Sequence, residues 1–95
     1  MPAASKRDGN ALWLSGVLDA ASVTALHAER WKLRGVEQIH LEQVSAVDST
    51  GVALIADLVA RAAKTGPRPQ VHGLPTGLTE LCSAYRIAPD FSDFP

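Results

Sequence analysis

The segment 47–54 joins the end of a predicted strand directly to the start of an apolar helix, with Asp48, Ser49, Thr50 and Gly51 at the junction. Asp and Ser are good N-cap residues, because their side-chain oxygens accept hydrogen bonds from the unpaired N–H groups of the first helical turn. A glycine there costs about 0.5–1 kcal/mol relative to alanine, which is sensible if another molecule must approach the backbone closely. The simpler interpretation is a plain strand–loop–helix junction, and both interpretations stay open here.

Strand-like and helix-like segments alternate along the rest of the chain. Leu12 and Leu14 share one face of a predicted strand and Trp13 the other, so this strand is expected inside a sheet. Strands are predicted at 11–18, 36–43 and 70–74. Helices are predicted from a cap within 19–22 to about residue 34, at about 50–65, and from 75–76 to 85. The turn Asp8-Gly9-Asn10 predicts a hairpin with the preceding residues, and residues 1–7 are either disordered or a weak edge strand.

This alternation predicts an α/β fold with parallel strand pairs joined by right-handed crossovers. The hairpin makes the sheet mixed, so we expect four to five strands with helices mainly on one face. The 95 residues form one domain, 1–95. The predicted core is apolar at strand and helix spacing and consists of Ile39, Leu41, Val47, Ile55, Leu58, Val59, Leu81 and Tyr85.

Composition narrows the class of partner. Nine basic and ten acidic residues give a net charge of −1 without a basic cluster, which argues against nucleic-acid binding. No apolar stretch approaches the roughly 20 residues of a membrane span, and the N-terminus lacks the apolar region of a signal peptide, so no direct membrane insertion is expected. The single cysteine, Cys82, fits a reducing compartment and a buried apolar position. These features predict a cytoplasmic domain.

Motifs for catalysis or metal binding are missing from the sequence. It has no phosphate-binding glycine loop, no nucleophile elbow and no paired Cys or His motif. His27 is expected to stack on Trp31 as a packing residue, because no second ligand stands at metal-binding spacing. His40 and Glu42 share a strand face, which is far more often solvated than metal-binding. We therefore predict that the protein is not an enzyme and needs no cofactor or metal.

Three segments resemble the STAS domain family, named after sulfate transporters and anti-sigma factor antagonists. They are residues 14–19, 41–54 and 71–74, within a similarity that extends over about 11–91. In the anti-sigma antagonist branch, the hydroxyl residue directly before the glycine of the Asp-Ser-Ser/Thr-Gly motif is phosphorylated by a partner kinase. The matching residue is Thr50, so the resemblance implies phosphorylation at Thr50, with Ser49 as the neighbouring alternative.

A second branch, MlaB, is similar in being a short stand-alone STAS subunit of a phospholipid ABC transporter that maintains outer-membrane lipid asymmetry. Its last helix ends in L-x-x-L-x-x-x-Y, as do Leu78, Leu81 and Tyr85 here, followed by 87–89. In that branch a Thr directly after the Asp is important for binding the ATPase subunit. Ser49 stands in its place, and Thr50 stands where that branch has Gly, so the antagonist branch remains the alternative.

The resemblance implies a non-catalytic subunit that binds and stabilises the ATPase subunit of an ABC transporter. Through that subunit it would meet the membrane permease complex and lie peripheral to the inner membrane. The alternative partner is an anti-sigma factor kinase. The expected partner-binding residues are Asp48, Ser49, Thr50, Gly51 and Leu54. Leu54 is included because the apolar arc of its helix is wider than a single core-facing stripe.

Overall fold

Two long neighbouring strands form the middle of the sheet. The computed structural model describes residues 3–88 and residue 91. The strands are β1 (Ala4–Asp8), β2 (Ala11–Leu18), β3 (Gln38–Val47) and β4 (Gln70–His72), in the order β1-β2-β3-β4. β1 pairs antiparallel with β2 through the predicted hairpin, whereas β2–β3 and β3–β4 are parallel. The prediction of an α/β fold with a mixed sheet is confirmed.

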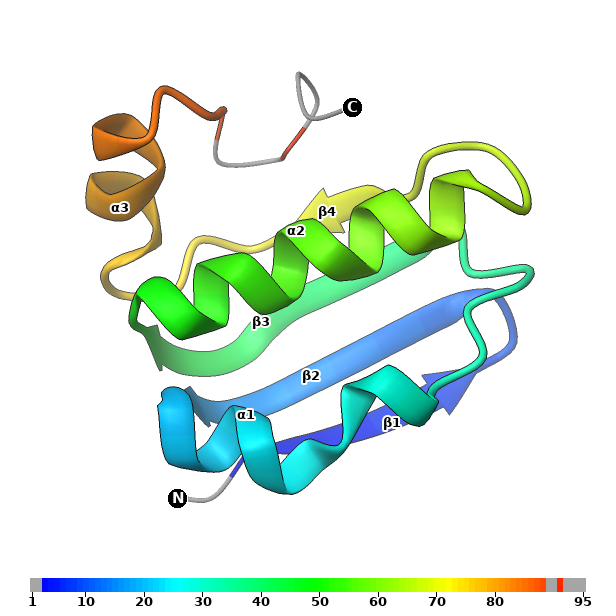
Figure 1. Cartoon of the computed structure of the whole chain (residues 1–95), viewed down its shortest axis with the longest axis horizontal. Helices are drawn as coiled ribbons and strands as arrows, with labels where there is room; N and C mark the ends of the chain where they lie inside the picture. Colours follow the sequence, from blue (N-terminus) through cyan, green and yellow to red (C-terminus); the bar gives the residue numbers. More distant parts are fainter. Residues whose placement is uncertain (1–2, 89–90, 92–95) are drawn as a thin grey trace.

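The helices cover one face of this sheet (Figure 1). They are α1 (Ala20–Leu26), the short 3₁₀ helix η1 (Ala28–Arg30), α2 (Ser49–Ala63) and α3 (Leu78–Ala84). α2 lies along β3, α1 lies over the β1–β2 side, and α3 lies near the N-terminal end of α2. No helix within the described ranges combines the length and apolar character needed to cross a membrane.

The core lies between the sheet and α2. Leu12, Leu14 and Leu18 alternate inward along β2, as the period of a strand requires. β3 begins in the same way with Ile39 and Leu41, but its register with β2 then shifts, so that its next inward residues are Val44 and Val47. Ile55, Leu58 and Val59 of α2 are fully buried against this surface.

The core prediction is right for six of the eight residues, and the two exceptions lie in or directly after α3. Leu81 is only partly buried, and Tyr85 is 52% exposed, so the prediction for Tyr85 is wrong. The reason is that α3 ends at Ala84 and the chain turns at Arg86, whose φ is 58°, so the helical spacing stops applying. Phe91, which follows this turn, is instead fully buried. Phe94 of the predicted tail lies outside the described residues.

The connection between β2 and β3 also differs from the predicted helix, which was expected to run from a cap within 19–22 to about residue 34. α1 stops at Leu26 because His27 adopts a left-handed conformation with φ of 52°. The predicted stacking of His27 on Trp31 is therefore wrong, and the His27 Nδ1 atom lies 3.5 Å from Glu29 Oε1. Two arginine side chains hold the irregular segment that follows. Arg61 donates to the carbonyls of residues 28 and 31, and Arg7 to those of residues 32 and 34.

Candidate partner-binding site

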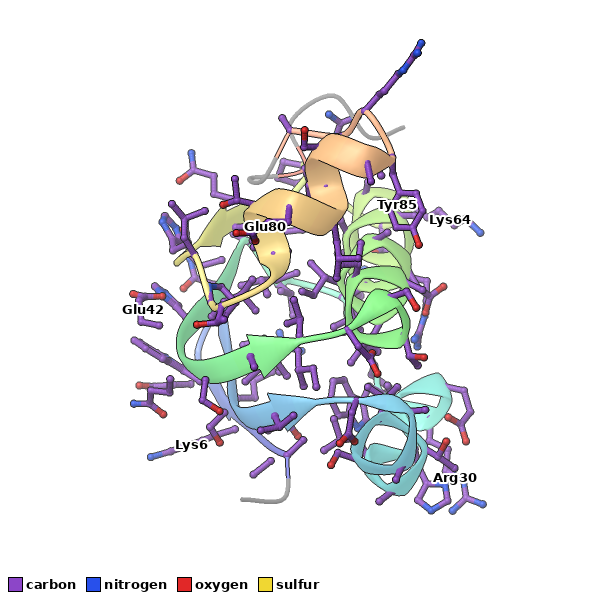
Figure 2. All side chains as sticks on the ribbon, turned by 90° about the vertical axis from the view of Figure 1, so that its left-hand side faces the viewer. Lys6, Arg30, Glu42, Lys64, Glu80 and Tyr85 are labelled. Atoms are coloured by element: carbon purple, nitrogen blue, oxygen red, sulfur yellow. The ribbon has the colours of Figure 1, made fainter. Side chains whose placement is uncertain are left out.

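Two parallel strands and two helix starts meet at one edge of the molecule. Leu18, the last residue of β2, is paired with Val47, the last residue of β3. Asp19 and Asp48 follow these strands and cap α1 and α2. Figure 2 looks onto this side of the molecule, with the sheet on one side, α1 and α2 on the other, and α3 above. We refer to this surface, formed by residues 19–22, 48–51 and 75–77, as the carboxyl edge.

Asp48 anchors the start of α2 through several hydrogen bonds. Its Oδ1 atom accepts from the backbone N–H of Gly51 at 3.0 Å, which is the predicted N-cap bond. Its own N–H donates to the Leu18 carbonyl at 3.2 Å, and its carbonyl accepts from Val52 at 3.0 Å. The first turn of α2 is therefore fixed to the end of β2, although Asp48 itself is exposed.

A close contact within the chain explains why a glycine stands at position 51. It is buried, and a Cβ atom built on it would lie 2.5 Å from the Leu18 carbonyl oxygen and 2.8 Å from Leu18 Cβ. Such distances are far below van der Waals contact. The close approach that the sequence attributed to a second molecule is therefore an approach of α2 to the protein's own β2.

The remaining predicted site residues differ in exposure. Ser49 is exposed, and Thr50 is half-buried beside it. Leu54 is only 7% exposed and belongs to the hydrophobic core. The wide apolar arc of α2 is thus covered within the chain, since α2 contacts both α1 and α3. Of the predicted residues, Asp48 and Ser49 offer the most surface to a partner.

A third segment, which the sequence did not place in the site, completes the carboxyl edge. The Val47 N–H donates to the Thr76 carbonyl at 3.0 Å, and Ala46 forms a parallel bridge with Thr76. Gly77 has φ of 91°, and a Cβ there would lie 2.7 Å from the Val47 carbonyl oxygen. This packing brings the start of α3 next to the start of α2.

Asp19 is the other residue at this edge that the site prediction omitted. Its Oδ1 atom accepts from the Ser22 N–H at 2.8 Å. The hydrogen bond from the Ser22 backbone, followed by one from the Ser22 side chain, lowers the pKa of the Asp19 carboxyl. The sequence could have placed Asp19 in the site, because an Asp that follows each of two adjacent parallel strands lies at the same edge of the sheet.

The histidine–glutamate pair and the cysteine that the sequence singled out lie away from this edge. His40 is hydrogen-bonded to Glu42 at 3.1 Å on the opposite face of the sheet, and Cys82 is buried in α3. Within residues 3–88 and at residue 91, no three His, Cys, Asp or Glu side chains are arranged to hold a metal ion. The arrangement at the carboxyl edge is that of a binding surface with fixed backbone geometry, made of carboxylates and small hydroxyl side chains.

Comparison with known proteins agrees with this fold. A search of curated proteins gave no match. The family model described as MlaB, STAS domain, matches residues 3–89, which is nearly the whole chain. The match includes the parallel strands, the capped α2 and the α3 start that build the carboxyl edge. The chain therefore belongs to the MlaB-type STAS domain family.

Proposed function

We propose that this protein is a non-catalytic subunit that binds and stabilises the ATPase subunit of a phospholipid-transporting ABC complex. The complex would maintain the lipid asymmetry of an outer membrane, and the protein would lie on the cytoplasmic side, reaching the permease through the ATPase. STAS domains are in general binding modules rather than enzymes. The family description MlaB supports the transporter branch over the antagonist branch.

The single observation that carries the proposal is the exposure of Ser49 on a rigid support. Ser49 is the first residue of α2, directly after the cap Asp48, and the next turn is fixed by the contact of Gly51 with β2. A partner can therefore approach a small side chain whose backbone does not have to reorganise. Binding that needs little reorganisation loses less free energy to the ordering of loops and side chains.

A specific complex needs more surface than Ser49 and Asp48 provide, because stable interfaces bury roughly 1,200–2,000 Å² in total. α3 supplies a candidate extension, since its start packs beside the start of α2. Tyr85 at its end is 52% exposed (Figure 2). Tyrosine is enriched among the residues that dominate binding energy. We expect Tyr85→Ala to weaken ATPase binding by about tenfold, measured by isothermal titration calorimetry.

The main test places a long charged side chain at the proposed centre. Ser49→Arg is expected to abolish capture of the ATPase subunit in a pull-down, because the guanidinium would occupy the space of a close contact. The matched control is Thr65→Arg, which adds the same side chain after the opposite, exposed end of α2. The two positions are separated by roughly 24 Å of helix, so the control should bind as wild type does.

Circular dichroism of both variants must match wild type, because a positive charge near a helix N-terminus costs about 0.3–1 kcal/mol. If Ser49→Arg binds the ATPase as tightly as wild type, the proposed site is wrong. If the wild-type protein ignores the ATPase but captures an anti-sigma kinase and is phosphorylated on Thr50 or Ser49, the antagonist function replaces the proposed one.

A further inference from the structure

The face of the sheet opposite the helices carries a row of three ring side chains. Trp13, His40 and His72 each stand next to core-facing residues of β2, β3 and β4, so they point to the opposite side. The strand register pairs Trp13 with His40 and His40 with His72. Glu42, which bonds to His40, is labelled on this side of the sheet in Figure 2.

The three rings stack face to face across the strands. The ring centroids of Trp13 and His40 are 4.0 Å apart with an interplanar angle of 10°, and those of His40 and His72 are 4.8 Å apart at 19°. His40 Nδ1 lies 3.1 Å from Glu42 Oε1, and His72 Nε2 is hydrogen-bonded to Gln38 Oε1. The His40 side chain is only 19% exposed, because rings cover both of its faces.

His40 lies between an aromatic ring and a carboxylate. A charged His40 ring would lie against the indole of Trp13, an arrangement that attracts cations, and beside the carboxylate of Glu42. Burial raises the pKa of Glu42, but the hydrogen bond from His40 and the charges of His40 and His72 outweigh it and lower that pKa overall. Glu42 therefore keeps its negative charge to a lower pH than an ordinary glutamate does.

His72, in contrast, has the His40 ring as its stacking neighbour. A charged His72 would face a charged His40 across 4.8 Å, and like charges at this distance repel. Lys6 of β1, opposite Trp13, is a further cation on this face, and Asp8 lines the same hollow as Lys6 and Trp13. Glu42 is the carboxylate that faces the pair, and its oxygens already lie beside His40.

The edge strand that carries His72 is short. β4 has three residues, each paired with one residue of β3, and it forms the outer edge of the sheet. We propose that the Trp13–His40–His72 stack is a proton-sensitive fastening of β4, which holds this strand while at most one imidazole is charged and loosens it when both are.

A double-mutant cycle with His40→Gln and His72→Gln tests the fastening, with urea unfolding of each protein at about pH 8 and about pH 5, on either side of the usual histidine range. On going from the higher to the lower pH, His72→Gln is expected to gain about tenfold in folded-to-unfolded ratio relative to wild type. The same substitution in the His40→Gln background should show no such gain. His27→Gln is the matched control, since His27 lies outside the stack and its side chain is 58% exposed. A coupling between positions 40 and 72 that is equal at both pH values overturns the proposal.

A second measurement needs no substitution in the stack. In a Trp31→Phe protein, Trp13 is the remaining tryptophan, and its fluorescence should fall on acidification as the adjacent imidazole becomes charged.

In nuclear magnetic resonance spectra, the ring protons of His40 and His72 should each report both protonation steps. The amide signals of 70–72 should shift at the second step, while those of β1 should not change. Independent single-step titrations with unchanged β4 signals would refute the idea.

Discussion

The two crossover connections of the sheet begin alike and then diverge. Each starts with an Asp after a parallel strand, and each Asp accepts a hydrogen bond from the N–H three residues later. After this, α1 runs for seven residues without a buried side chain, whereas α2 runs for 15 residues with eight buried. The cap chemistry is shared, so it cannot be what decides the length or placement of the helix.

The difference lies in how closely each helix approaches the sheet. α2 has Gly51 at the position where α1 has Ser22, and the missing Cβ lets α2 rest on the end of β2. α1 stays peripheral, and the chain after it is held both by the buried side chains of Ala28, Leu33 and Val36 and by the arginine hydrogen bonds. Burial along a whole face therefore distinguishes the long helix, whereas the irregular connection combines a few buried side chains with long-range polar contacts.

The largest expected effect comes from removing the close approach of α2. Gly51→Ala would force a methyl group against the Leu18 carbonyl, which belongs to the backbone and cannot rotate away. We expect it to destabilise the protein by about 3 kcal/mol, measured as the free energy of urea unfolding. Gly66→Ala, where nothing lies within 4 Å of the added atom, is the control and should stay within about 0.5 kcal/mol. A well-tolerated Gly51→Ala would remove the distinction between the two helices.

An intermediate effect is expected where α2 supports the first connection. Arg61 donates to the Ala28 carbonyl at 2.9 Å and to the Trp31 carbonyl at 2.7 Å. Arg61→Met keeps most of the side-chain length but leaves both carbonyls without this donor, at a cost of about 2 kcal/mol in urea unfolding.

The ion pair of Arg61 with Asp57, at 3.3 Å, is partly exposed and should contribute little of that loss. Asp57→Asn is therefore a suitable control, with an expected change below about 0.5 kcal/mol. If Asp57→Asn and Arg61→Met are equally destabilising, the ion pair rather than the carbonyl bonds stabilises the segment.

The smallest effect concerns the cap of α1 and depends on pH. The pKa of Asp19 is lower in the folded protein because of its hydrogen bonds from Ser22. A lowered folded pKa contributes stability that is present above the unfolded value, about 4, and is lost as the pH falls through the folded value. The small stability difference between wild type and Asp19→Asn at neutral pH should therefore disappear in acid, measured by urea unfolding from about pH 7 to about pH 2.

Asp8→Asn, at the exposed end of β1, provides the matched change in charge for this comparison. A stability difference for Asp19→Asn that is constant over the whole pH range would mean that the carboxylate charge does not strengthen the cap.

Much of the fold was predicted from the spacing of apolar residues along the chain, and the buried residues of the structure follow the same spacing. Leu12 and Leu14 alternate in β2, and Ile55, Leu58 and Val59 repeat at helical spacing in α2, because each set had a single buried surface to face. Asp48 was recognised as a cap from local chemistry alone. The prediction failed at His27 and Tyr85, where left-handed residues at or near the helix ends turn the chain although the apolar spacing continues.

In the candidate site, too, some features follow from neighbouring residues in the sequence and others from contacts between distant segments. The capped start of α2, the small residues 48–51 and the family of the chain could be read from the sequence, because they depend on residue types that stand next to one another. Tertiary contacts, in contrast, place Gly51 against Leu18, bury Leu54 and pair Thr76 with Ala46 at the end of β3. Those facts depend on contacts between segments far apart in the chain, and a local pattern does not encode the distance between them.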